Sequence, residues 1–239
     1  MPLPPRAIVT VTSAHAPLHG PDKITGLFIV EAMHPYNIFT EVGIEVDFVS
    51  EKGTYVPDWL SQQPDFLNGE DLKQWEDTNG EFRKKLDNMY KPSEIDPSRY
   101  GIFFASAGHA ALMDYPTATG LHKIGSQIWA NGGILSSVCH GAAIFAGIND
   151  PATDKPVVEG KTITGFTTQA EYDMGIMEAL RTWNAPMIDE HAAKLGAKYT
   201  RPKGVWDSFH VTDGRLITGT NPASSKETAT AVLGVYRAL

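Results

Sequence analysis

The sequence has only one cysteine, Cys139, among its 239 residues. One cysteine can neither form an internal disulfide nor build a zinc site that needs several thiolates, and it fits a reducing compartment. Hydrophobic residues make up 42% of the chain, which is enough to bury a full core without cross-links or metals. We therefore expect an intracellular globular protein.

Basic residues and long apolar runs are also scarce. The 20 Lys and Arg residues are outnumbered by 28 Asp and Glu, which argues against binding to a nucleic-acid backbone. The longest basic run, "RKK" at 83–85, lies among acidic residues and predicts a solvated helix face. No run approaches the roughly 20 apolar residues of a bilayer span, and the N-terminus lacks the features of a secretory signal. We expect neither a nucleic-acid nor a membrane partner.

Hydrophobic patterns that are present alternate between strand and helix. Strands are predicted at 6–13, 44–51, 100–108 and 133–138, with helices at 24–43 and 115–133 between them. Such βαβ units imply a parallel sheet with right-handed crossovers. Pro35 predicts a kink or a boundary near His34 in the first helix. Further along, the patterns predict a strand at 159–167, a helix at 185–199, a hairpin at 208–219 around Asp213-Gly214, and a helix from 221.

The segment from 51 to 99 interrupts this alternation. It is polar, holds the aromatic residues Trp59, Phe66, Trp75 and Phe82, and is too long for a structureless loop in a compact domain. We predict an insertion with short helices that acts as a cap or an interface in one α/β domain over 1–239. No phosphate-binding loop of the P-loop or dinucleotide type occurs, so we expect no cofactor.

Cys139 lies in the apolar stretch "GGILSSVCHGAAIFAG" at 132–147. A lone cysteine in such a run usually packs as a small hydrophobic residue. Here a strand, a sharp turn and a helix resemble a nucleophile elbow, with Gly141 permitting close backbone approach. A helix N-terminus there would favour the thiolate and offer free N–H groups to an oxyanion. With His140 beside it at the carboxyl end of a strand, we predict that Cys139 is a nucleophile.

Other polar residues are weaker candidates. Glu31 lies in "FIVEAMHP", where burial would raise its pKa, although a helix-face glutamate is usually solvated. Histidines at four positions match no zinc spacing, so we predict loop or helix-surface roles and no metal site: His15, His19, His34 and His109. Three aromatic residues are predicted to line the core or a cleft: Tyr115, Trp129 and Trp206.

Several motifs together carry a resemblance to a known family. "SVCHGAAIF", "FFASAGHA", "VEAMHPYNIF", "EGKTITGFT" and "TDGRLITGTNPASS", in order from about 8 to 235, resemble the ThiJ/PfpI superfamily, specifically its fungal branch of stress-induced, chaperone-like, glutathione-independent glyoxalases. "DFLNG" at 65–69 also resembles this branch. The resemblance implies a flavodoxin-like three-layer α/β sandwich with a mostly parallel sheet, and a homodimer.

The resemblance also implies a site. Cys139 is the nucleophile, His140 its base, and Glu171 the acid of a Cys-His-Glu triad. Asp173, two residues further on, could orient His140 instead. Glu31 matches the glutamate that approaches the cysteine sulfur, and the backbone N–H groups of Gly108 and His140 match an oxyanion hole.

The activity implied is conversion of methylglyoxal to D-lactate, and of glyoxal to glycolate, without a cofactor. The partners implied are a small dicarbonyl substrate, a second copy of the chain and unfolded client proteins, in the cytoplasm and the nucleus. Two other readings stay open: a cysteine peptidase or deglycase, and a holdase chaperone or redox sensor with an oxidisable cysteine. Glutamine hydrolysis is disfavoured because the late His-x-Glu motif of class I glutaminases is missing.

Overall fold

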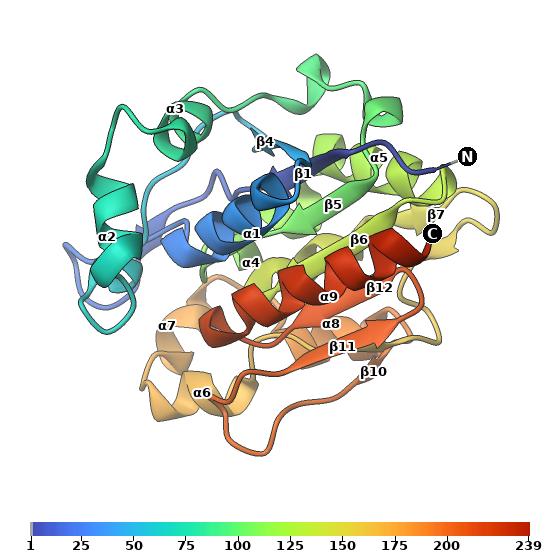
Figure 1. The fold of residues 1–239 in the computed structure, drawn as a ribbon. Helices are drawn as coiled ribbons and strands as arrows, with labels where there is room; N and C mark the ends of the chain where they lie inside the picture. The colour runs from blue at the N-terminus through green and yellow to red at the C-terminus, as the bar shows by residue number, and fades with distance from the viewer. Residues whose placement is uncertain (1) are drawn as a thin grey trace.

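A six-stranded sheet forms the middle layer of the computed structural model, which describes residues 2–239 (Figure 1). Its strand order is β11-β12-β6-β5-β1-β4, and only β11 runs antiparallel to its neighbour. The strands are β1 (Arg6–Thr10), β4 (Glu45–Val49), β5 (Ile102–Ala105), β6 (Ile134–Val138), β11 (His210–Asp213) and β12 (Leu216–Gly219). The predicted mostly parallel three-layer architecture is confirmed.

The central strands are apolar because helices cover the sheet on both faces. Every residue of β5 and β6 is buried, as expected of a parallel sheet enclosed between helices. The edge strand β11 is mostly half-buried, and it joins β12 through the predicted turn at Asp213-Gly214. The sheet core therefore lies around β1, β5 and β6, whose carboxyl ends lead into the loops that carry Cys139 and His109.

Helices α1 (Ile29–Glu41) and α9 (Ser225–Ala238) pack side by side on the face turned toward the viewer in Figure 1. Helices α4 (Ala111–Asp114), α5 (Thr119–Ala130) and α8 (Ile188–Lys194) lie behind the sheet. The boundary predicted near His34 is wrong, because α1 continues through Pro35. Nine of the 13 residues of α1, Pro35 among them, are buried between the sheet and its neighbours, and this packing offsets the hydrogen bond that proline removes.

The insertion contains short helices, as predicted: η1 (Leu60–Gln62), α2 (Gly69–Glu76), α3 (Glu81–Asp87), η2 (Pro92–Glu94) and η3 (Pro97–Arg99). Helices η1, α2 and α3 lie on the side of α1, at the left and upper left of Figure 1, whereas η2 and η3 pack against α5. Phe82 of α3 is buried, with its ring centroid 5.4 Å from that of Tyr36. His34 bonds Asp71 of α2 at 2.8 Å. The insertion thus borders the helix that carries Glu31.

The segment after β6 differs from the prediction. Residues Cys139–Ala146 form the 3₁₀-helix η5 rather than an α-helix. The predicted strand at 159–167 shortens to β9 (Thr162–Ile163), which pairs with β10 (Lys198–Tyr199) outside the main sheet. Helices α6 (Thr168–Asp173) and α7 (Met177–Thr182) were not predicted.

The remaining elements are small: strand pairs β2 (Ala16–Pro17) with β3 (Ile24–Thr25) and β7 (Asn149–Asp150) with β8 (Lys155–Pro156), and the turns η4 (Tyr115–Thr117) and η6 (Pro222–Ser224). Across residues 2–239, none of the helices has both the length and the apolar character needed to cross a bilayer.

Candidate active site

Cys139 stands at the turn between β6 and η5. Its φ of 58° is left-handed, a conformation that non-glycine residues rarely adopt. A Cβ at Gly141 would collide with the backbone oxygen of Ala105, so the predicted close approach at this glycine is confirmed. The Cys139 side chain is 2% exposed. The tight turn thus fixes the sulfur in a buried position at the carboxyl end of the central strand β6.

His140 and Glu171 form a hydrogen-bonded chain with Cys139. His140 Nδ1 lies 3.2 Å from Cys139 Sγ, and His140 Nε2 lies 2.7 Å from Glu171 Oε1. Because an ionised carboxylate only accepts hydrogen bonds, Nε2 carries the hydrogen, and the lone pair of Nδ1 faces the thiol. Asp173 is exposed and accepts from Gln169 instead. Of the two carboxylates, Glu171 is the one in contact with His140.

A second histidine is hydrogen-bonded to the other oxygen of the Glu171 carboxylate. His109 Nε2 lies 3.0 Å from Glu171 Oε2, and its ring centroid is 4.3 Å from that of His140. His109 lies in the loop after β5, as predicted, but it is buried rather than exposed. No sequence signal pointed to this contact, because Glu171 lies 62 residues away along the chain.

The other three candidate histidines make no hydrogen bond to this cluster within residues 2–239. His34 is buried beneath α2, which corrects its predicted surface role, because the insertion covers the face of α1 that carries it. His15 is exposed, and His19 is half-buried beside Trp59.

Charge separates the members of this cluster. Burial raises the pKa of Glu171, but His109 and His140 outweigh that effect and bring it down to about 2. Desolvation lowers the pKa of His140, and neighbouring His109 lowers it further. At neutral pH His140 is therefore an uncharged imidazole that can accept a proton from the thiol.

Glu31, on α1, is completely buried. Its Oε2 accepts a hydrogen bond from the Ala107 N–H at 3.1 Å, and its Oε1 has no hydrogen bond of good geometry within residues 2–239. Desolvation raises the pKa of Glu31 to about 8, although the nearby thiol of Cys139 and the Ala107 N–H act to lower it. Glu31 is therefore protonated at neutral pH, as expected for a carboxyl in an apolar segment.

The resting thiol is also neutral. Burial raises the pKa of Cys139 well above its ordinary value, and the carboxyls of Glu31 and Glu171 raise it further. The backbone N–H of His140 acts to lower this pKa. The expectation that a helix N-terminus holds a thiolate is wrong, because a short 3₁₀-helix replaces the α-helix and desolvation dominates. Proton removal must therefore accompany any attack by the sulfur.

Gly108 precedes His109 in the loop after β5. Its φ of 139° requires glycine, and a Cβ there would collide with the Gly26 backbone oxygen. The Gly108 N–H makes no hydrogen bond within residues 2–239, and Gly108 and Cys139 line the same cavity. An N–H in that position can receive a substrate oxygen.

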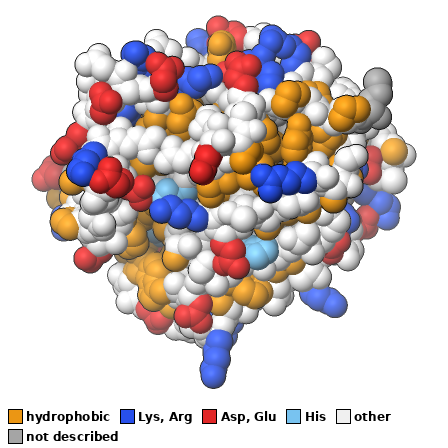
Figure 2. Space-filling view, in the orientation of Figure 1, with side chains coloured by type: hydrophobic (Ala, Val, Ile, Leu, Met, Phe, Trp, Pro, Cys, Tyr) orange, Lys and Arg blue, Asp and Glu red, His pale blue; other side chains and the backbone are white. Residues whose placement is uncertain are grey.

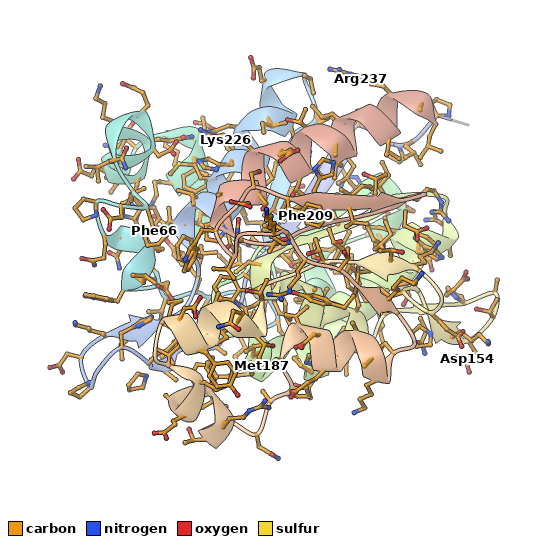
Figure 3. All side chains as sticks on the ribbon, turned by 90° about the horizontal axis from the view of Figure 1, so that it is seen from below. Phe66, Asp154, Met187, Phe209, Lys226 and Arg237 are labelled. Atoms are coloured by element: carbon orange, nitrogen blue, oxygen red, sulfur yellow. The ribbon has the colours of Figure 1, made fainter. Side chains whose placement is uncertain are left out.

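The cavity over Cys139 is narrow, at about 10 Å³, which is room for about one water molecule. Phe66, Trp206 and Pro222 line both this cavity and an outer one of about 380 Å³ that also contacts Val30 and His34. In Figure 2 the surface is hollowed between α2 and the N-terminal ends of α1 and α9. Figure 3 shows Phe66 where the insertion meets the rest of the molecule. These side chains separate Cys139 from the hollow.

The predicted aromatic roles hold. Trp206 is 46% exposed and lines the cleft. Tyr115 is fully buried and donates a hydrogen bond to the Ser106 carbonyl at 2.7 Å. Trp129 is buried at the edge of the core, with the Arg215 guanidinium 3.9 Å from its ring centroid.

One group among residues 2–239 has the spacing of a metal site: ligand atoms of His109, His140 and Glu171 all lie within 4.8 Å of one another. Each imidazole Nε2 already has its own carboxylate oxygen as a hydrogen-bond partner. Hydrogen bonds therefore account for the cluster, and we assign no metal to it.

No family model matches the chain, but individual relatives do. Glyoxalase 3 of Candida albicans is 44% identical over 231 residues, covering 97% of this chain and 98% of that protein. The glutathione-independent glyoxalase HSP31 of Saccharomyces cerevisiae is 46% identical over 226 residues, covering 95% of each chain.

Solved structures agree. The crystal structure of glyoxalase III from Candida albicans superimposes with a TM-score of 0.94 at 44% identity, covering 96% of each chain. A ThiJ/PfpI domain protein from Brachyspira murdochii, at 14% identity and a TM-score of 0.60 over 99% of this chain and 98% of its own, shares the fold. The chain therefore belongs to the family of glutathione-independent glyoxalases and has the α/β fold of the ThiJ/PfpI proteins.

Proposed function

We propose that this protein converts methylglyoxal, and glyoxal, into the corresponding 2-hydroxy acids without glutathione. One observation carries the proposal: the Cys139 thiol lies between a neutral base, His140 at 3.2 Å, and a neutral acid, Glu31. An intramolecular oxidation and reduction needs such a pair, because protons must leave one carbon and reach its neighbour. The named activities of the two fungal relatives support the same reaction.

In the first step, Cys139 Sγ bonds to the aldehyde carbon, C1, while His140 Nδ1 takes the thiol proton. Glu171 holds His140 in the required tautomer through the 2.7 Å hydrogen bond. The N–H groups of Gly108 and His140 bind the oxygen as the carbonyl electron pair moves onto it. Glu31 then gives its proton to this oxygen, which leaves a neutral hemithioacetal and a Glu31 carboxylate.

In the second step, the Glu31 carboxylate removes the proton from C1. The electron pair forms a C1=C2 double bond, and the C2 oxygen takes a proton from the His140 imidazolium, giving an enediol. Glu31 then returns a proton to C2, and its carboxylate recovers the C1 hydroxyl proton as the thioester forms. C1 has been oxidised and C2 reduced by the same electron pair, so the balance requires no external oxidant or reductant.

In the last step, water hydrolyses the thioester. His140 takes a proton from the water, whose oxygen bonds to C1, and the C1–S bond breaks. The proton then returns from His140 to the Cys139 sulfur. From methylglyoxal and one water the product is lactic acid, which we expect as the D isomer; glyoxal gives glycolic acid.

The direct test incubates the purified protein with methylglyoxal in the absence of glutathione and measures lactate with enzymes specific for each stereoisomer. We expect D-lactate from wild type and none from Cys139→Ala, because no other thiol exists in the chain. Absence of lactate from a folded wild-type protein, or full activity in Cys139→Ala, would contradict the proposal.

The alternative functions receive less support. The printed activity of both fungal relatives is that of a glyoxalase, not of a peptidase or a deglycase. Oxidation of Cys139 proceeds through the thiolate, and the raised pKa of this thiol disfavours that form. A fluorogenic peptide panel and a peroxide titration of Cys139 would test these readings.

We further expect a homodimer in the cytoplasm and the nucleus, and a separable action on unfolded client proteins. Sedimentation of the purified protein tests the first expectation. Suppression of client aggregation that survives Cys139→Ala would support the last.

A further inference from the structure

Glu171 is shared between two imidazoles, one of which has no part in the steps above. His109 and His140 each direct Nε2 to a different oxygen of this carboxylate, at 3.0 Å and 2.7 Å. The three side chains are at most 5% exposed. Since a carboxylate only accepts hydrogen bonds, both Nε2 atoms carry a hydrogen. The charge of each imidazole then depends on whether its Nδ1 atom also carries one.

Burial favours one particular charge state. With both imidazoles neutral, the cluster would hold an unbalanced negative charge away from water. With both protonated, two positive rings would lie 4.3 Å apart. A single imidazolium beside one carboxylate is neutral overall, and the remaining imidazole is then uncharged.

The positions of the two rings decide which histidine carries the charge. His140 Nδ1 faces a thiol 3.2 Å away, so a hydrogen on that nitrogen would prevent it from accepting the thiol proton. Desolvation opposes charge on both rings and Glu171 favours it on both, but the pKa of His109 is raised above its ordinary value, while that of His140 is lowered, with His109 adding to the lowering.

We propose that His109 is a positioning residue that acts as an imidazolium: it balances the charge of Glu171 and so keeps His140 in the neutral form that receives the Cys139 proton. The proposal rests on the proposed function for its catalytic meaning. Its structural content, one charged and one neutral imidazole on a shared carboxylate, does not depend on the substrate.

Other titratable groups near the cluster do not replace this cation. They are His19, Lys23, Asp58, Cys139 and Glu31. His19 comes from the loop between β2 and β3, with its ring centroid 6.1 Å from that of His109, and burial lowers its pKa. Lys23 lies against the Trp59 ring, 4.2 Å from its centroid. Asp58 accepts from Thr25 at 2.6 Å and adds negative, not positive, charge near the imidazoles.

The first test reads the charge directly. Nitrogen NMR of histidine-labelled Cys139→Ala separates imidazolium from the two neutral tautomers without requiring turnover. Of the two histidines on Glu171, we expect the one whose signals are lost when His109→Gln is added to be an imidazolium at pH 7, and His140 to be neutral with hydrogen on Nε2. A neutral His109, or a charge on His140, would overturn the proposal even if the protein proves to be a glyoxalase.

The second test measures kcat/KM for methylglyoxal against pH in His109→Gln, which keeps a donor for Glu171 but no charge. We expect the acid limb to move upward by about one pH unit, with a loss of about 10-fold at the acid side. A residue with only a structural role would lower kcat/KM by the same factor at every pH, and that result would contradict the proposal. His191→Gln is the matched control, because His191 is a buried histidine on α8 outside this cluster, and its acid limb should stay in place.

Discussion

Two carboxyls reach the Cys139–His140 pair from different helices, and burial affects them in opposite ways. Glu31 on α1 and Glu171 on α6 are both almost fully buried. The pKa of Glu31 rises to about 8, whereas that of Glu171 falls to about 2. Burial alone would raise both pKa values.

The difference lies in what surrounds each group. Glu171 has an imidazole at each oxygen, and these partners stabilise its charge. Glu31 has one backbone N–H at Oε2 and no cation, so its neutral form is favoured. Two chemically similar side chains are thereby assigned different tasks: Glu171 orients a base, and Glu31 can supply a proton.

Of the substitutions that remove the difference between the two carboxyls, Glu171→Gln should have the largest effect on activity. An amide cannot accept from both histidines through two oxygens, so His140 loses the tautomer that faces the thiol. We expect kcat/KM for methylglyoxal to fall about 10³-fold to 10⁴-fold. Asp173→Asn, on the same helix but exposed, should retain wild-type activity, and equal losses in the two variants would show that α6 acts only structurally.

Neutralising the other carboxyl should have a smaller effect on rate and a distinct effect on pH dependence. Glu31→Gln removes the group that moves protons, and we expect kcat/KM to fall about 10²-fold to 10³-fold. In the wild type, Glu31 loses its proton as pH rises through about 8, so the acid that protonates the substrate oxygen disappears. In wild type, kcat/KM should therefore fall as the pH rises past about 8, and this fall should be missing from the residual activity of Glu31→Gln. A fall at the same pH in both proteins would show that another group causes it.

The last expected effect is a shift in thermal unfolding, and its sign differs between the two carboxyls. The Glu31 pKa is raised in the folded state, so its contribution to stability is complete below the unfolded value of 4.5 and declines as pH rises toward about 8. The slope in this window is about 1.4 kcal/mol per pH unit.

Glu31→Gln removes this dependence. Thermal unfolding should therefore occur at higher temperature in Glu31→Gln than in wild type at pH 7.5, with the gap narrowing toward pH 5. Glu171→Gln should show the reverse, because a depressed pKa stabilises the folded state above the unfolded value. Identical pH slopes in wild type and Glu31→Gln would refute the raised pKa.

Much of the scaffold was predictable because it depends on local patterns. The apolar runs of β5 and β6, the Asp213-Gly214 turn and the glycine after Cys139-His140 each carry their own structural requirement. The apolar neighbours of Glu31 were enough to predict its raised pKa.

The predictions that failed concern features that depend on contacts between segments far apart in the sequence. The sequence did not predict α6, so it could not show which of Glu171 and Asp173 contacts His140. In the structure, α6 buries Glu171 and leaves Asp173 exposed. The contact of His109 with Glu171 joins the loop after β5 to helix α6, and the two segments share no local pattern. The neutral thiol follows from desolvation, which exists only once the chain is folded, and Pro35 remains inside α1 because surrounding elements bury that helix.

The left-handed backbone of Cys139 has a consequence for how this protein would respond to selection. A non-glycine residue in that conformation costs on the order of 1 kcal/mol, and glycine would remove the cost. A library of variants chosen only for survival on heating would thus be enriched in substitutions at this turn. The variants that best survive heating would lack the nucleophile and be inactive, so a stability screen of this protein must also select for turnover.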